Sequence, residues 1–262
     1  MSRLQNLFQQ NKARKILNVY CTAGFPKLES TIEVMKALQE HGADIIELGI
    51  PYSDPLADGP VIQASGSQAL ENGMSIAKLF EQLQDFRKEI TLPVVLMGYL
   101  NPVLQFGFSR FCAEAARVGI DGLILPDLPM YEFETEYGTV IKKYGLDFIF
   151  LVTPETSEER IRKVDALSTG FIYAVSSSST TGGDKDFGLT EGYLQNLQQM
   201  QLHNPVLVGF GIKDKPSFEA ATQHASGGII GSAYIKALQQ GGPINETTRD
   251  FLAQIISEPK MA

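Results

Sequence analysis

The amino-acid sequence predicts a single (β/α)8 barrel, also called a TIM barrel, over residues 1–262, with an extra helix at the N-terminal end. Three observations lead to this prediction. Eight short segments rich in β-branched residues alternate with longer amphipathic segments, as in parallel α/β folds. The chain has 262 residues, close to the roughly 250 of one such barrel. No linker or low-complexity segment divides it. An open doubly wound sheet is the alternative arrangement.

The predicted strands are apolar at successive positions, as in Val94-Val95-Leu96-Met97, which indicates burial on both faces of a parallel sheet. The eight strands are Ile16–Tyr20, Ala43–Ile50, Pro93–Tyr99, Gly122–Pro126, Asp147–Thr153, Gly170–Ser176, Pro205–Gly209 and Gly227–Gly231. The helices predicted between them include Ser30–His41, Ser75–Lys88, Ser109–Arg117, Glu132–Tyr144, Ser157–Leu167 and Lys215–His224.

Similar joints precede three of the strands. They read Gly42-Ala43-Asp44, Gly119-Ile120-Asp121-Gly122 and Gly145-Leu146-Asp147. A glycine just past a helix suits the left-handed position that ends many helices. The repeated joint therefore supports a repeated helix-to-strand unit.

The first fifteen residues carry Leu4, Leu7 and Phe8 at helical spacing, which predicts a short amphipathic helix over one end of the core. They lack the apolar segment of a signal peptide. A basic cluster leaves a targeting segment as the weaker alternative; it comprises Lys12, Arg14 and Lys15. No apolar run approaches the roughly 20 residues that span a bilayer, so we expect a cytoplasmic protein without a membrane partner.

The net charge of -8 argues against nucleic acid as a partner, because a polyphosphate requires a broad basic face. It leaves room for one small phosphate group, which backbone N–H groups can bind. The two cysteines, Cys21 and Cys112, form no disulfide framework, which favours a reducing compartment.

In a barrel of this kind the active site lies at the carboxyl ends of the strands. The three histidines do not meet this condition, because each is at a helix end or just before a strand; they are His41, His203 and His224. We therefore expect neither a metal site nor a histidine base. No predicted strand ends in lysine, and Lys213 lies in a charged loop. Cys21 has no histidine partner at that end, so packing is its expected role.

Glu47 interrupts the apolar second strand, Ile45-Ile46-Glu47-Leu48-Gly49-Ile50. A charge on a solvated strand face is the alternative, but a barrel buries both faces. Burial raises the pKa of a carboxyl group and makes it a competent proton carrier near neutrality. Glu47 is therefore the first catalytic candidate.

The loop after this strand, Pro51–Pro60, contains three prolines and Gly59, which restrict its path. We expect Asp54 to make only a local turn. On spacing alone, Asp58 is equally compatible with a local turn and with a second carboxylate held over the barrel mouth.

Glycines follow the last strands, at Gly209-Phe210-Gly211 and at Gly231-Ser232-Ala233, where a short helix from Ser232 to Lys236 is expected. Thr180-Thr181-Gly182-Gly183 follows the sixth strand. Glycines let backbone amides approach an anion, and a helix N-terminus adds its dipole. Simple turns are the alternative, but this is the usual phosphate site of such barrels.

Several segments along nearly the whole chain resemble those of the tryptophan synthase α subunit family. The most specific runs from Glu47 to Pro60 and reads Glu-Leu-Gly-Ile-Pro-Tyr-Ser-Asp-Pro-Leu-Ala-Asp-Gly-Pro. The others are Gly98-Tyr99-Leu100-Asn101-Pro102, Leu125-Pro126-Asp127-Leu128-Pro129, Gly209-Phe210-Gly211-Ile212 and Gly231-Ser232-Ala233.

The resemblance implies a lyase that cleaves indole-3-glycerol phosphate to indole and glyceraldehyde 3-phosphate. It implies that Glu47 moves protons at indole C3 and at the substrate hydroxyl, and that Asp58 interacts with the indole nitrogen. The implied substrate-binding residues are Tyr20, Tyr99, Leu125, Tyr173 and Thr181. The implied phosphate-binding residues are Gly182, Gly211, Gly231 and Ser232.

The resemblance also implies a partner, a β subunit that carries pyridoxal phosphate, in an α2β2 assembly; the chain itself would need no cofactor. The sequence departs from the family where Ser177 and Ser179 replace an arginine and a glycine of the lid, and where Tyr131 replaces a glutamate. Three alternatives remain, namely a free-standing lyase that releases indole, another phosphosugar-binding barrel, and a non-catalytic subunit.

Overall fold

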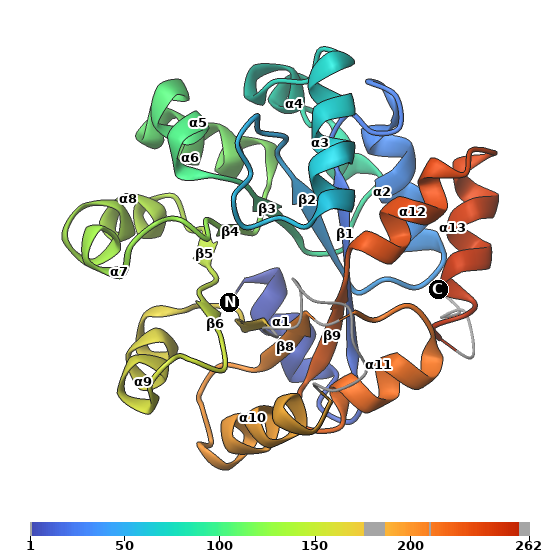
Figure 1. Cartoon of the computed structure of the whole chain (residues 1–262). Coiled ribbons are helices and arrows are strands. Elements are labelled where there is room, and N and C mark those ends of the chain that lie inside the picture. The colour runs from blue at the N-terminus through green and yellow to red at the C-terminus, as the bar shows by residue number, and fades with distance from the viewer. Residues whose placement is uncertain (1, 176–186, 210, 257–262) are drawn as a thin grey trace.

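A parallel sheet curled into a barrel, with helices around its outside, forms the protein (Figure 1). The computed structural model describes residues 2–175, 187–209 and 211–256. The strands are β1 (Ile16–Thr22), β2 (Ile45–Gly49), β3 (Val94–Met97), β4 (Gly122–Ile124), β5 (Asp147–Phe148), β6 (Leu151–Val152), β7 (Ile172–Val175), β8 (Val206–Gly209) and β9 (Gly227–Ile230).

The helices that precede the fifth barrel strand are α1 (Arg3–Gln10), α2 (Ser30–Glu40), α3 (Pro60–Glu71), α4 (Ile76–Gln82), the 3-10 turn η1 (Phe86–Lys88), α5 (Leu100–Phe106), α6 (Phe108–Val118), α7 (Met130–Glu132), the π-helical η2 (Phe133–Tyr137) and α8 (Gly138–Lys143). Those that follow are α9 (Glu158–Leu167), α10 (Phe187–Gln199), α11 (Lys215–Thr222), α12 (Ser232–Gln239) and α13 (Ile244–Leu252). Among the helices described, none is long and apolar enough to cross a bilayer.

The sheet runs in the order β5-β4-β3-β2-β1-β9-β8-β7-β6, with every neighbouring pair parallel. Its two end strands, β5 and β6, are separated in the chain by Ile149 and Phe150 alone. The Ile149 N–H donates to Leu123 O at 3.0 Å, and the Tyr173 N–H donates to Phe150 O at 3.0 Å. This segment therefore bridges β4 and β7 and closes the sheet. The predicted (β/α)8 barrel is confirmed, with the predicted strand Asp147–Thr153 divided into two short segments.

The joints between helices and strands have the expected backbone. Gly42, Gly119 and Gly145 have φ values of 103°, 97° and 69°. These values lie in the left-handed region that favours glycine. The helix predicted over Ser75–Lys88 is interrupted, since α4 ends at Gln82 and η1 begins at Phe86. The helix predicted over Glu132–Tyr144 is continuous, with η2 as a π-helical segment between α7 and α8.

Two apolar clusters hold the fold together. The larger one lies between the sheet and the surrounding helices. The smaller one fills the amino-terminal end of the barrel with inward-facing side chains and with Leu4 of α1; its buried members are Leu4, Ile16, Ile45, Val95, Ile124, Ile149, Phe171, Leu207 and Ile229. Leu4 is fully buried, and the Ser2 hydroxyl caps its helix by accepting from the Gln5 N–H at 3.2 Å. The predicted amphipathic N-terminal helix is therefore confirmed, and it closes one end of the barrel.

The aspartate of a helix-to-strand joint fastens the base of the barrel. The Asp121 carboxylate accepts from the Val94 N–H at 2.8 Å, from Arg3 at 2.9 Å and from Arg87 at 2.5 Å. Asp44 makes the same kind of contact with the Leu17 N–H at 2.9 Å. These buried carboxylates connect neighbouring strands, which is a structural role.

Asp121→Ala is expected to destabilise the protein by about 3–5 kcal/mol, because it leaves the mostly buried guanidinium of Arg87 without its carboxylate partner. Chemical denaturation measures this change. Asp85→Ala is the matched control, because it breaks an ion pair with Lys88 in which both side chains are about three-quarters exposed. A similar small loss of stability in the two variants would contradict the assigned role of Asp121.

Candidate active site at the carboxyl ends of the strands

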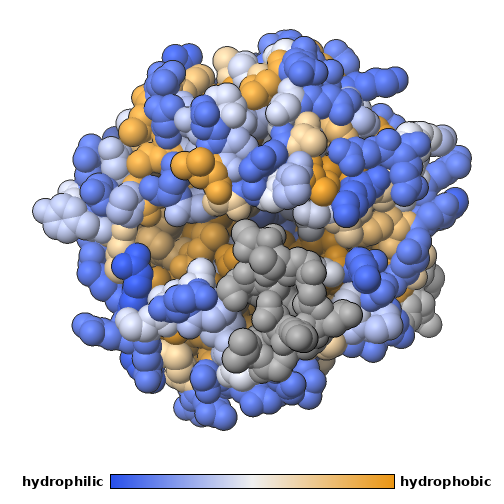
Figure 2. Space-filling view, in the orientation of Figure 1, coloured by the Kyte–Doolittle hydropathy of each residue, from blue (hydrophilic) through white to orange (hydrophobic). Residues whose placement is uncertain are grey.

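Side chains from several strand ends converge at the mouth of the barrel. In the parallel register of β1 and β2, Tyr20 lies opposite Glu47. Side chains alternate along a strand, so Glu47 shares the inward face of β2 with Ile45, a member of the barrel-filling cluster. Figure 2 shows a hollow with hydrophobic walls near the centre of the molecular face that it draws, and hydrophilic residues surround this hollow. An apolar molecule with a polar end suits such a surface.

Glu47 is a buried carboxyl group with a strongly altered acidity. Its exposed fraction is 1%. Burial raises its pKa to about 8, with a smaller increase from the negative charge of Asp58, while a hydrogen bond from Asn18 opposes the change. The Asn18 amide nitrogen donates to Glu47 Oε2 at 2.7 Å. At neutral pH the side chain is therefore mostly protonated and can donate a proton.

Asp58 is held over the mouth by the loop between β2 and α3. Its N–H donates to Pro55 O at 3.1 Å, and its own carbonyl accepts from the Gln63 side chain at 2.8 Å. Tyr99 follows β3, and its hydroxyl accepts from the Ala57 N–H at 3.0 Å. This hydrogen bond helps to hold the loop in place. Partial burial raises the pKa of Asp58 to about 6, against the effect of a hydrogen bond with Tyr99. Asp58 is therefore largely ionised at neutral pH.

Two tyrosines complete the cluster around these carboxyl groups. Burial raises the pKa of Tyr20, and burial together with the charges of Glu47 and Asp58 raises that of Tyr173 well above its usual value. Both hydroxyls therefore stay protonated and can donate hydrogen bonds. The structure thus brings together four of the residues predicted from the sequence, since Tyr20, Glu47, Asp58 and Tyr173 all interact electrostatically.

Glycines make room for both tyrosine rings. A Cβ atom on Gly49 would lie 2.1 Å from the Tyr20 hydroxyl oxygen, and one on Gly209 would lie 2.6 Å from the Tyr173 ring. Such separations are far below van der Waals contact. Gly209, which the sequence suggested as part of an anion site, therefore also has a packing role beside Tyr173.

The predicted phosphate-binding residues in the described part of the chain lie after β8 and β9. A Cβ atom on Gly211 would meet no other atom within 4 Å, so the backbone here faces open space. Gly231 immediately precedes α12, and Ser232 is its first residue. The first N–H groups of a helix have no partner within it and can bind an anion. The expected helix from Ser232 is confirmed and extends to Gln239.

The remaining predicted residues are placed as follows. Leu125 is buried one residue beyond β4, at the same rim of the barrel. Tyr99 is 7% exposed and follows β3. Thr181 and Gly182 lie outside the described residues.

The cysteine and two of the histidines considered in the sequence are placed as follows. Cys21 is 1% exposed, and burial raises the pKa of its thiol, which makes it a poor nucleophile. His41 and His224 contact Asn245 and Gln198, away from the mouth. Within residues 2–175, 187–209 and 211–256, no group of three His, Cys, Asp or Glu side chains is placed to hold a metal.

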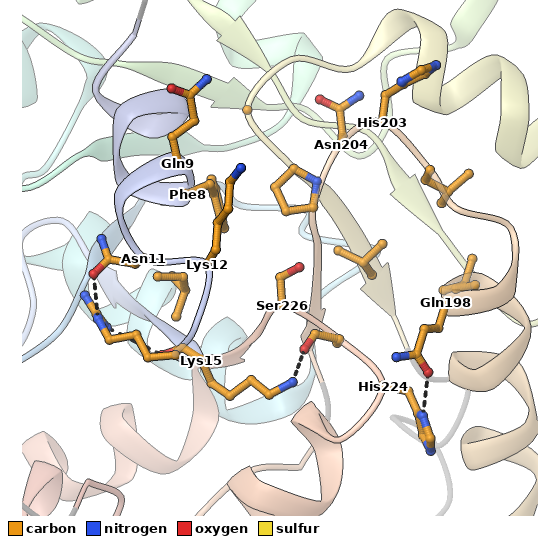
Figure 3. Close-up of a pocket in the computed structure, with 18 of the residues that line it drawn as sticks. Phe8, Gln9, Asn11, Lys12, Lys15, Gln198, His203, Asn204, His224 and Ser226 are labelled. Carbon is orange, nitrogen blue, oxygen red and sulfur yellow. Dashed lines mark hydrogen bonds between the residues drawn. The ribbon is translucent and has the colours of Figure 1, made fainter.

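A wide groove of about 880 Å³ lies at the other end of the barrel (Figure 3). Lys12 and Gln9 border it on one side, and Asn204 and His203 on the other. It is formed by α1 and by the segments that precede β1, β8 and β9, so the barrel-filling cluster separates it from Glu47. The groove is therefore not part of the candidate active site.

Two polar residues near the site were not predicted. Asn18 is fully buried in β1, and Gln63 of α3 holds the loop that carries Asp58. Asn18 interrupts the apolar run Ile16-Leu17-Asn18-Val19-Tyr20 in the way that Glu47 interrupts its own strand. The argument that identified Glu47 also applies to this asparagine. No comparable signal in the sequence marks Gln63.

Known proteins resemble this chain over nearly its full length. Residues 4–260 match the family described as "Tryptophan synthase alpha chain". The chain is 50% identical to the tryptophan synthase alpha chain of Bacteroides thetaiotaomicron over 92% of this chain and 94% of the relative. It is 50% identical to that of Flavobacterium johnsoniae over 97% of this chain and 100% of the relative.

Solved structures give the same result. The crystal structure of tryptophan synthase subunit alpha from Legionella pneumophila has a TM-score of 0.88 and 35% identity, with 97% of each chain covered. A chain from tryptophan synthase of M. tuberculosis in the aminoacrylate-bound form has a TM-score of 0.84 and 32% identity, with 98% of this chain and 100% of that chain covered.

Proposed function

Because the chain belongs to the tryptophan synthase alpha chain family, we propose that Glu47 and Asp58 carry out its lyase reaction by proton transfer and charge stabilisation. The reaction is the aldol cleavage of indole-3-glycerol phosphate to indole and glyceraldehyde 3-phosphate in L-tryptophan biosynthesis. The observation that carries this mechanism is the pair of neighbouring carboxyl groups with separated pKa values, about 8 for Glu47 and about 6 for Asp58. Such a separation distinguishes an acid from an anion at one pH.

Glu47 supplies and recovers the proton that cleavage requires. As the protonated member of the pair it donates to C3 of the indole, which interrupts the aromatic ring. The resulting carboxylate accepts the proton of the side-chain hydroxyl. The carbon–carbon bond then breaks, its electron pair returns to the ring as indole, and the hydroxyl carbon becomes the aldehyde. Glu47 ends the cycle protonated, so no net proton is consumed.

Asp58 stabilises the charge that develops on the indole nitrogen. When C3 is protonated, the ring N–H becomes positively polarised, and an ionised carboxylate is the favourable hydrogen-bond acceptor for it. Tyr20, Tyr173 and Leu125 provide walls for the apolar indole, and Tyr99 steadies the loop of Asp58. Thr181 is proposed as a further substrate contact.

The phosphate group of the substrate is proposed to bind at the N-terminal end of α12. Gly231 and Ser232 begin this helix, and Gly211 faces open space on the neighbouring loop. Backbone N–H groups and the helix dipole bind an anion without a basic side chain. Gly182 would complete the site.

The family implies a tryptophan synthase β subunit as partner, and we propose an α2β2 assembly in the cytoplasm. Residues 1–262 would act in it as one catalytic domain without a cofactor, while pyridoxal phosphate would belong to the β subunit. The docking surface would include the loop after β2 and the region of Asn101 and Pro102. Leu56 in that loop is 95% exposed, which suits burial by another chain.

Release of glyceraldehyde 3-phosphate by the purified chain, with and without a β subunit, tests this function. Slow cleavage alone and strong stimulation by the β subunit are expected. Rapid cleavage without stimulation would support a free-standing lyase instead. The absence of cleavage in both conditions would contradict the proposal and favour a phosphate-binding barrel with another activity.

A further inference from the structure

Asn18 occupies an unusual position for a polar side chain. It lies in the middle of β1, between Ile16 of the barrel-filling cluster and Tyr20 at the mouth, and its side chain shares their inward face. It is fully buried. Burial of an amide is unfavourable unless its polar atoms are hydrogen-bonded, so a strand interior normally has an apolar residue here.

Within the described part of the chain, the Asn18 side chain hydrogen-bonds to one group, and that group is the proposed acid. Its nitrogen donates to Glu47 Oε2 at 2.7 Å. Its oxygen is buried and has no hydrogen-bond partner among the described residues. Nothing in the described structure therefore fixes which end of the amide faces Glu47. A half-turn about the last side-chain bond would exchange the two ends.

This geometry fits both protonation states of Glu47. An ionised carboxylate only accepts hydrogen bonds and needs the amide nitrogen, whereas a protonated carboxyl group can donate to the amide oxygen. We propose that Asn18 is a positioning residue that keeps the Glu47 carboxyl group hydrogen-bonded in both states of the catalytic cycle. The inference rests on the proposed role of Glu47.

The other titratable groups around Glu47 are Asp58, Tyr20, Cys21 and Tyr173, from the β2–α3 loop, β1 and β7. Each of them becomes neutral or negative on titration, and none can stabilise a carboxylate by positive charge. Among the residues that the structure describes, Asn18 is therefore the one whose hydrogen bond lowers the pKa of Glu47, against the effect of burial. Removal of its amide should leave a Glu47 that ionises only at higher pH.

Infrared titration of the Glu47 carboxyl group tests the inference without any turnover, with Glu47→Gln as the spectrum to subtract. Asn18→Leu, which has a similar volume and no polar atom, is expected to raise the midpoint by about one pH unit, because the bond lost from the ionised carboxylate is stronger than the bond lost from the protonated form. The Glu47-dependent limb of the kcat profile should move in the same direction, with little change in KM. Asn18→Ser, which retains a donor, should shift the midpoint less than the leucine variant.

Thr248→Val is the matched control, because it removes a different fully buried polar group that is hydrogen-bonded: the Thr248 hydroxyl donates to Ile244 O at 2.7 Å and lies in α13, outside the barrel. It should lower the melting temperature and leave the Glu47 midpoint unchanged. An Asn18→Leu midpoint equal to that of the wild type, or lower, would overturn the inference. Should the leucine variant fold poorly, Asn18→Val provides the same comparison in a smaller side chain. The expected midpoint shift in a protein whose wild type shows no cleavage, with or without a β subunit, would count against the proposed function alone.

Discussion

Glu47→Gln is expected to lower kcat for cleavage of indole-3-glycerol phosphate by about 10²–10⁴-fold, the range typical of a lost general acid–base group. Glutamine has nearly the same shape, so packing around Asn18 and Tyr20 should persist, but an amide cannot exchange the proton at C3. Steady-state release of glyceraldehyde 3-phosphate, with the β subunit present, measures the loss. KM should change little because the phosphate and indole contacts remain.

The same variant, although it loses activity, should gain thermal stability relative to the wild type at higher pH. Burial raises the pKa of Glu47 from its usual 4.5 to about 8 in the folded protein, so the folded state disfavours the ionised side chain. The protonated form of Glu47 therefore contributes to the stability of the folded protein. This contribution is complete below pH 4.5 and is lost as the pH rises through about 8. Glu47→Gln should therefore gain thermal stability relative to the wild type as the pH increases from 6 to 9. Full activity in this variant would rule out Glu47 as the proton carrier.

Asp58→Asn is expected to lower kcat/KM by about 10²–10³-fold, the range found when one preorganised group that stabilises developing charge is removed. Asparagine retains an acceptor for the indole N–H but lacks the negative charge. The wild type should lose activity as the pH falls through about 6, where Asp58 becomes protonated, and the variant should lack this acidic limb. Rate measurements across the pH range test both statements.

Asp54→Asn is the matched control for this prediction. Asp54 lies in the same loop, is exposed, and its carboxylate accepts from the Ser53 hydroxyl at 2.8 Å. Measured on the chain without a β subunit, its substitution should leave the rate unchanged. Equal losses at positions 54 and 58 would show that the loop conformation, rather than the charge of Asp58, determines the rate.

The barrel could be predicted from the sequence because its strands carry a strong local signal. Apolar segments such as Val94–Met97 are bounded by glycine joints, and the same unit recurs along the chain. Helix α3 was not among the predicted helices for a physical reason. Its buried residues are Ser65, Gly66 and Ala69, so it has no stripe of large apolar side chains. It approaches β1 closely instead, where Ser65 and Thr22 share a hydrogen bond of 2.8 Å.

The candidate site was predictable where a charge interrupts a buried strand, as at Glu47. It was not predictable where function depends on a loop path. The position of Asp58 is set by Gln63 of α3 and by Tyr99, which follows β3. No local pattern reports the contact of Tyr99 with a loop some forty residues earlier. The same holds for Gly209, whose packing against Tyr173 depends on the pairing of β7 with β8.

The buried position of Glu47 also affects the proton balance of folding. In an unfolded chain at neutral pH this side chain is ionised, whereas in the closed barrel its pKa of about 8 keeps it mostly protonated. The chain must therefore take up a proton from solvent as it folds. At the base of the barrel, Leu4 packs in one cluster with side chains of strands that lie some two hundred residues later in the chain, such as Leu207 and Ile229. The capacity of Glu47 to act as an acid is thus a property of the complete barrel, to which strands from both ends of the chain contribute.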